Sequence, residues 1–210
     1  ITNRVIPQIS GSNAWKMAYG SDILPIGETN AVQLSTLNSG DGGESFALGG
    51  VGALADGNMA GIEWTVSGAG LLAFDWKVSS EADYDVLRFY EVGETTTNVI
   101  SGTGGGWTRI PLTVQGETNT VHTFRWEYEK DPVGDYVGED CGWVDAITWI
   151  PLYTLTVIGS ASGGSYTNGQ QVLITADIPQ SGYTFERWIG ATQYVANVTS
   201  ATTVVTMPAS

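Results

Sequence analysis

Three carboxylates follow one another at two-residue intervals in the segment Ser-Ser-Glu-Ala-Asp-Tyr-Asp, at Glu81, Asp83 and Asp85. Alternate side chains of an extended chain face the same side, so an extended segment would place these three together. Carboxylates this close repel one another, and Ca²⁺, which takes about six to eight oxygen ligands, would relieve the repulsion. The segment is therefore a candidate calcium site, and the alternative is an acidic turn in solvent.

A second acidic set combines Asp41 and Glu44, in a glycine-rich loop, with Asp140 and Asp145 late in the chain. Asp145 alternates with Trp143 and is expected to point inward. A buried carboxylate must be paired, hydrogen-bonded or bound to a metal, and basic partners are few. Asp145 is thus a candidate metal ligand, with hydrogen bonds to backbone amides as the alternative.

Aromatic side chains could bind sugars, because sugar rings stack their C–H faces on exposed Trp or Tyr. Four aromatic residues are expected to be exposed: Trp15, Tyr19, Trp107 and Tyr136. On two expected strands, Tyr90 with Arg88 and Arg125 with Glu127 fall on the outward phase. These four could form a sugar-binding platform on a sheet face, and ordinary pairing of Arg with Glu across strands is the alternative.

Composition excludes several classes of function. The 210 residues include 22 acids and 8 bases, a net charge of −14, which argues against nucleic acid and against anionic membranes. One cysteine and one histidine exclude a disulfide framework and make zinc sites and His-dependent catalytic triads very weak hypotheses. His122 opens an expected strand, and Asp140 beside Cys141 would raise the thiol pKa. We expect no catalytic residue and no membrane insertion.

The elements that must position these residues are almost all strands. Alternating apolar and polar residues predict strands at 31–34, 45–48, 62–66, 72–78, 87–90, 110–114, 124–128 and 143–149. Short strands separated by turns rich in Gly, Asn and Ser predict a β-sandwich. Four tryptophans lie on the inward phase and are expected in its core: Trp76, Trp126, Trp143 and Trp149.

A composition shift near residue 150 predicts two all-β domains, at 1–150 and 151–210. Beyond it there is one basic residue, Arg187, and 20 of the 22 acids precede it. Strands are expected in the second domain at 153–158, 171–176, 185–189 and 202–207.

Several stretches of the first domain carry a family resemblance: Phe74-Asp75-Trp76-Lys77-Val78-Ser79-Ser80-Glu81, Tyr84-Asp85-Val86-Leu87-Arg88-Phe89-Tyr90, His122-Thr123-Phe124-Arg125-Trp126-Glu127-Tyr128 and Gly142-Trp143-Val144-Asp145. They resemble a jelly-roll module of large secreted bacterial proteins, MAM-like or carbohydrate-binding. The resemblance implies a structural Ca²⁺ between an early loop, here Asp41 and Glu44, and a late strand, here Asp145.

The second domain resembles a divergent internalin-type B-repeat, a small β-grasp-like module. The resemblance is carried by Tyr153-Thr154-Leu155-Thr156-Val157, Gly164-Ser165-Tyr166, Gly182-Tyr183-Thr184-Phe185, Trp188 and Thr206-Met207-Pro208. Such repeats usually continue through one more strand, so we expect a truncated repeat within a longer protein.

The resemblance and the missing catalytic motifs favour a non-catalytic carbohydrate-binding module of a secreted bacterial polysaccharide-degrading enzyme, with polysaccharide as its partner. An alternative is a calcium-stabilised adhesion or structural segment of a large surface protein. A catalytic β-sandwich that uses the acidic clusters is a third hypothesis. The excess of acids favours neutral or lightly charged polysaccharides over strongly anionic ones.

Overall fold

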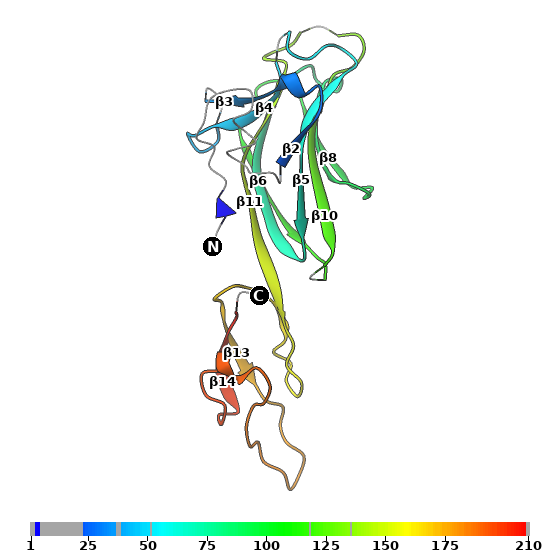
Figure 1. The fold of residues 1–210 in the computed structure, drawn as a ribbon. Coiled ribbons are helices and arrows are strands. Elements are labelled where there is room, and N and C mark those ends of the chain that lie inside the picture. The colour runs from blue at the N-terminus through cyan, green and yellow to red at the C-terminus, as the bar shows by residue number, and fades with distance from the viewer. Residues whose placement is uncertain are drawn as a thin grey trace. The chain divides into compact units, whose positions relative to one another are not determined.

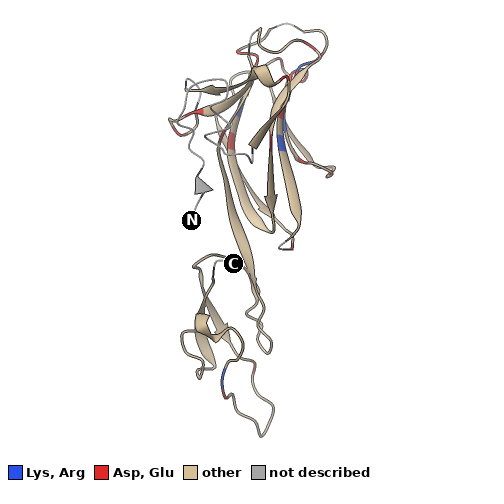
Figure 2. Ribbon diagram, in the orientation of Figure 1, with Lys and Arg blue, Asp and Glu red and all other residues tan. Residues whose placement is uncertain are grey.

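The computed structural model describes residues 3–4, 23–36, 39–50, 52–117, 119–134 and 136–208 (Figure 1). The chain divides into two compact units, Ile1–Trp149 and Ile150–Ser210. Within the described ranges, no helix is long and apolar enough to cross a membrane. The charged side chains gather in the first unit, as Figure 2 shows.

Two antiparallel sheets build the first unit. One has the strand order β3 (Val32–Ser35), β4 (Ser45–Gly49), β11 (Cys141–Leu155), β6 (Gly70–Ser79) and β9 (Thr108–Val114), with β1 (Asn3–Arg4) pairing with β11. The other has the order β2 (Ile23–Gly27), β5 (Met59–Ser67), β10 (Val121–Glu129), β7 (Val86–Glu91) and β8 (Thr97–Ser101). From β4 to β11 the chain distributes its strands between the sheets in jelly-roll order, which confirms the expected β-sandwich.

Strict alternation in β6 and β10 produces the core between the sheets. Trp126 is fully buried, and its ring meets that of Phe74 edge-on, with centroids 5.2 Å apart. The expectation that Trp76, Trp126 and Trp149 lie in the core is confirmed. The intervening residues of these strands face away from the core, so the same alternation fixes which side chains the outer faces carry.

Alternation fails in β11, where Ala146 adopts a φ of 47°. Val144 belongs to the core and pairs with Phe46, so its neighbours Trp143 and Asp145 face the other way. Lys77, which also points away from the core, has its Nζ 4.9 Å from the Trp143 ring centroid. Trp143 and Asp145 are buried as expected, but on the opposite side of β11 from the core residue Val144. The predicted phase of this part of the strand is wrong, because the irregular backbone at Ala146 shifts it.

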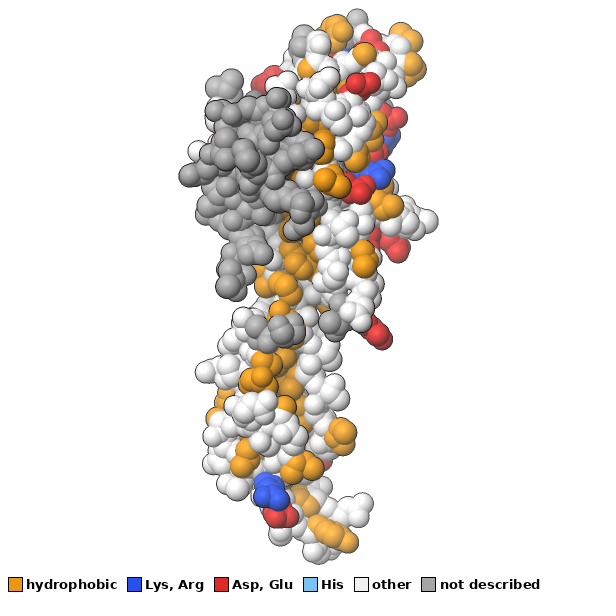
Figure 3. All heavy atoms as spheres, in the orientation of Figure 1, with side chains coloured by type: hydrophobic (Ala, Val, Ile, Leu, Met, Phe, Trp, Pro, Cys, Tyr) orange, Lys and Arg blue, Asp and Glu red, His pale blue; other side chains and the backbone are white. Residues whose placement is uncertain are grey.

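The second unit has a small core of its own. The end of β11 pairs with β12 (Gly164–Thr167), and β13 (Gln171–Thr175) pairs with β14 (Thr202–Thr206). Four residues form the buried cluster: Val172, Ile174, Val205 and Met207. Several large apolar side chains remain exposed in this unit: Ile158, Ile178, Tyr183 and Ile189. Figure 3 shows hydrophobic side chains at its surface.

The strand expected at residues 185–189 is not present. The Trp188 amide donates to Val198 O at 2.8 Å, and Trp188 Nε1 donates to Ser200 O at 2.9 Å. The backbone and the indole are thus both bonded to a neighbouring loop, which replaces the expected ladder of a strand.

Candidate functional site

The outer face of the sheet β2-β5-β10-β7-β8 carries a row of interlocking polar side chains. We call it the polar ladder and define it as Glu63, Arg88, Tyr90, Arg125, Glu127 and Glu129. Its members occupy adjacent register positions, because Arg125 pairs with both Glu63 and Tyr90, and Glu127 pairs with Arg88. The structure therefore brings together the four residues predicted as a platform, and adds Glu63 and Glu129.

Each member of the polar ladder is held by its neighbours. Arg125 Nη2 lies 2.6 Å from Glu63 Oε2, and Arg125 Nη1 donates to the Tyr90 hydroxyl at 3.2 Å. Tyr90 in turn donates to Glu127 Oε2 at 2.9 Å. Arg88 lies 3.9 Å from Glu127 Oε1 and forms an ion pair with Glu129. These contacts also agree with the alternative of cross-strand pairing.

The electrostatics fix the protonation of two members of the polar ladder, Tyr90 and Arg125. Burial raises the pKa of Tyr90, and the hydrogen bond to Glu127 raises it further, so the phenol is a donor at neutral pH. Burial acts against the charge of Arg125, but its hydrogen bonds to Glu63 and Tyr90 outweigh that effect and raise the pKa of the guanidinium. Besides the phenol of Tyr90, the polar ladder contains the guanidinium groups of two arginines and the carboxyl groups of three glutamates.

A second polar group joins the loops at one end of the sandwich. Lys130, which is buried, directs Nζ to Asp140 Oδ2 at 2.7 Å and to Asp56 Oδ1 at 2.8 Å. Tyr128 donates to Asp140 Oδ1 at 2.8 Å. Burial would lower the pKa of Lys130, but the bonds to Asp140 and Asp56 reverse this and raise it. We call these four residues the lysine cluster.

Tyr136 is exposed beside this cluster. Its ring centroid lies 4.3 Å from the Lys130 Nζ. The predicted exposure of Tyr136 is thereby confirmed. Tyr84, in the β6–β7 turn, is also exposed, and its exposure was not predicted.

The candidate calcium segment at residues 81–85 forms a turn, in which the Asp85 amide donates to Glu81 O at 3.2 Å. The segment is therefore not in the extended conformation that would place the three carboxylates on one side, and it forms the turn that was the alternative. Asp83 has a φ of 70° and is exposed, whereas Asp85 is buried. Asp85 Oδ1 accepts from the Asp131 amide at 3.0 Å. Burial raises the pKa of Asp85, and nearby Asp140 adds to the shift.

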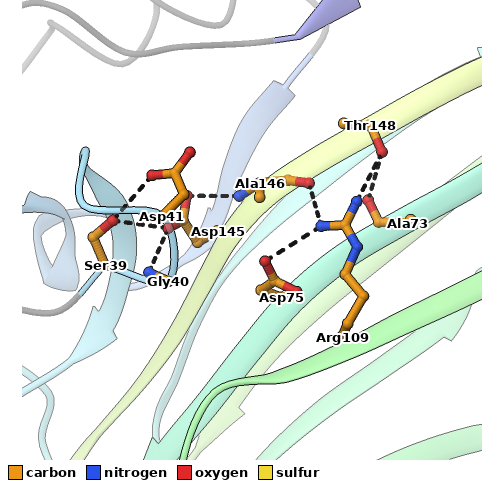
Figure 4. Close-up of polar contacts among 9 residues, drawn as sticks. All are labelled: Ser39, Gly40, Asp41, Ala73, Asp75, Arg109, Asp145, Ala146 and Thr148. Carbon is orange, nitrogen blue, oxygen red and sulfur yellow. Dashed lines mark hydrogen bonds and ion pairs between the residues drawn. The ribbon is translucent and has the colours of Figure 1, made fainter.

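The second acidic set is divided between two places. Asp140 belongs to the lysine cluster, whereas Asp145 binds the early loop, as Figure 4 shows. Asp145 Oδ2 accepts from the Gly40 amide at 2.7 Å and lies 3.0 Å from Ser39 Oγ, and its Oδ1 accepts from the Ala146 amide at 2.6 Å. Asp41 Oδ1 lies 3.2 Å from the same Ser39 Oγ.

These contacts match the hydrogen-bonded alternative for Asp145. Buried oxygens of Glu44, Glu81 and Asp85 have no hydrogen-bond partner among the described residues. Over those same residues, however, no three Asp, Glu, His or Cys side chains are grouped so as to hold a metal ion. The arrangement does not fit a preformed calcium site there, and calcium at these positions stays a prediction.

Arg109, on β9, contacts residues of β11 and β6 beside this region. It donates from Nη1 to Ala146 O at 3.0 Å and lies 3.3 Å from Asp75 Oδ2 (Figure 4). Trp107 was expected to be exposed but is half-buried, because it packs on the early loop, where a Cβ built on Gly40 would lie 3.3 Å from its ring. The candidates Trp15 and Tyr19 lie outside the described residues.

Neither reactive side chain suggests catalysis. His122 is buried, with Nδ1 2.7 Å from Glu91 Oε1. Burial raises the pKa of the Cys141 thiol to about 12, and Glu139 and Asp140 add to the shift.

We expect Cys141 to resist alkylation by iodoacetamide in the folded protein, because the thiolate is the reactive form. The thiol pKa is about 8.5 in the unfolded chain and higher in the folded protein, so a pH above about 8.5 deprotonates Cys141 in the unfolded chain first. The free energy of unfolding therefore falls as the pH rises above that value. Mass spectrometry of protein treated at pH 8, with and without urea, checks this. Rapid alkylation without urea would contradict it.

Residues 153–210 match the family model of the divergent InlB B-repeat domain. Among curated proteins, no sequence matches this chain. The solved structures similar to this chain include the carbohydrate-binding module TmCBM61, in complex with β-1,4-galactotriose, at 15% identity and a TM-score of 0.45 over 65% of this chain and 93% of that one.

The secreted serine protease VesC from Vibrio cholerae is similar at 19% identity and a TM-score of 0.41, over 57% of this chain and 24% of that one. A carbohydrate-binding module from the Cellvibrio mixtus lichenase 5A, in complex with cellotriose, is similar at 22% identity and a TM-score of 0.29, over 61% of this chain and 94% of that one. Several structural neighbours are thus carbohydrate-binding modules; likeness at this level carries no residue role to this chain.

Proposed function

We propose that the first unit is a non-catalytic module that binds polysaccharide on the outer face of the sheet β2-β5-β10-β7-β8. The polar ladder is the observation that supports the proposal. Its phenol, guanidinium and carboxylate groups are donors and acceptors for sugar hydroxyls. Because each is already fixed by a neighbour, little side-chain entropy is lost on binding.

The module would belong to a longer secreted chain and bring a polysaccharide-degrading enzyme to its substrate. Tyr90 supplies an aromatic surface at the centre of the ladder, and Arg125 Cζ lies 5.8 Å from its ring centroid. We propose as part of the same function that the chain continues into such an enzyme and that this enzyme is secreted.

Affinity electrophoresis tests the proposal with gels that contain soluble galactan, mannan, xylan or mixed-linkage glucan. We expect at least one polymer to retard the wild-type protein, and Tyr90→Ala and Arg125→Ala to remove the retardation. Thr113→Ala, at an exposed position of β9 in the other sheet, is the matched control and should be retarded like wild type. Reducing-sugar assays should detect no hydrolysis. Absence of retardation on every polymer, or retention of it by both ladder variants, would refute the proposal.

A further inference from the structure

The register of the sheet gives the binding face a direction. One row crosses all five strands through Leu24, Glu63, Arg125, Tyr90 and Thr97, which are successive partners in the ladder. Neighbouring strands lie about 4.8 Å apart, so the row is about 19 Å long. We propose that an internal segment of an uncharged, extended polysaccharide lies along this row, across the strands. This inference rests on the proposed function.

An exposed apolar side chain lies near each end of the row. Leu24, on β2, is 49% exposed, and Val99, on β8, is 50% exposed. Val99 is the partner of Arg88 and lies two residues along β8 from Thr97, so it is on the same face as the polar ladder, beside the end of the row. In the described part of the chain, β2 and β8 are the edge strands of this sheet. Leu24 and Thr97, at the two ends of the row, are both exposed, which is the observation that favours a polymer continuing past both ends.

The length of the row sets the size of the segment. Strands about 4.8 Å apart are spaced by nearly the length of one sugar unit in an extended chain, so the row holds about four units. The polar centre would bind the hydroxyls of the inner units, and Leu24 and Val99 would contact the C–H faces of the outer ones.

The charges of the face select an uncharged chain. Arg125 is occupied by Glu63, and Arg88 by Glu127 and Glu129, so an anionic polymer would have to displace a carboxylate to reach either arginine. It would also meet the 20 acids and 7 bases that precede residue 150. A hydroxyl can donate to Glu127 and accept from Arg88 while the existing pairs persist.

Charge selection is tested by comparing each retarding polysaccharide with its own carboxymethylated derivative. We expect carboxymethylation to weaken retardation at least tenfold at low salt, and added salt to reduce the difference by screening. The double variant Glu63→Gln and Glu127→Gln should recover part of the binding to the derivative. Equal or stronger retardation by the derivative would overturn the inference while leaving the proposed function intact.

Segment length is tested by calorimetry with oligosaccharides of two to six units cut from the retarding polymer. Affinity should rise about tenfold or more up to about four units and then level off, since longer chains add no contacts. Leu24→Ala and Val99→Ala should weaken binding of the four-unit chain and spare that of the two-unit chain; melting temperatures would establish that both fold.

Two results would contradict the predicted segment. One is equal affinity for two and four units, and the other is loss of binding when the chain end is reduced to the alditol. If no neutral polymer binds at all, the proposed function itself fails, which distinguishes the two claims.

Discussion

Replacing Lys130 by Met should lower the free energy of unfolding by about 3–5 kcal/mol, because removal of one partner leaves a buried charge uncompensated. Asp140 is fully buried, and only Lys130 supplies positive charge among the groups bonded to its carboxylate in the described structure. The methionine fills a similar volume, so the loss measures the missing ammonium and not a cavity.

Urea denaturation followed by tryptophan fluorescence measures this loss. Arg109→Met is the control: it removes the ion pair with Asp75 and the hydrogen bonds to Ala146 O and Thr148 Oγ1, and the Arg109 side chain is 44% exposed. Exposed pairs contribute about 0–1 kcal/mol, so the control should lose little. Lys130→Met and Arg109→Met variants of equal stability would refute the assigned role of the lysine cluster.

Asp145→Ala should destabilise the first unit by about 2–4 kcal/mol, because hydrogen bonds to a charged group are strong and their loss leaves donors unpaired. The change removes the acceptor of the Gly40 and Ala146 amides and of Ser39 Oγ. It therefore detaches the early loop from β11. Thermal unfolding of the variant beside wild type measures the effect.

The control is Asp41→Ala, whose carboxylate is exposed, accepts from the Gly43 amide at 2.9 Å and lies 3.2 Å from Ser39 Oγ in the same loop. It should lose about 1 kcal/mol or less. Repeating both melts in EDTA distinguishes the hydrogen-bonded loop from a calcium-bound one. If EDTA lowers the wild-type melting temperature as much as Asp145→Ala does, a metal ion, and not the amides, holds the loop.

Most of the sandwich could be predicted because alternation is a local property of the chain. Residues 72–78 and 124–128 reveal β6 and β10 unaided, since the core accepts only every second side chain. The edge strands β2 and β8 have no such pattern, and β8 is mostly exposed, so neither was predicted. The phase error at Asp145 has another cause: nothing in Val144-Asp145-Ala146 signals a positive φ at an alanine.

The candidate site likewise has one part that could be predicted from the sequence and one part that could not. The platform around Tyr90 could be predicted, because outward positions of β7 and β10 follow from the strands alone. The lysine cluster could not, because Asp56 comes from the β4–β5 loop and Lys130 and Asp140 from the two ends of the β10–β11 loop, so their meeting depends on the whole fold. The one available signal was a lysine directly after a strand in a chain with few bases.

The alternation of β10 also bears on how the proposed binding face can evolve. Arg125 and Glu127 on the outer face flank the core residue Trp126, so inserting one residue there would exchange the outward-facing and core-facing sets. Related sequences should therefore diversify at these positions by substitution alone, while insertions and deletions accumulate in the loops. New specificity can then arise by changing outward side chains, with the hydrophobic interior left as it is.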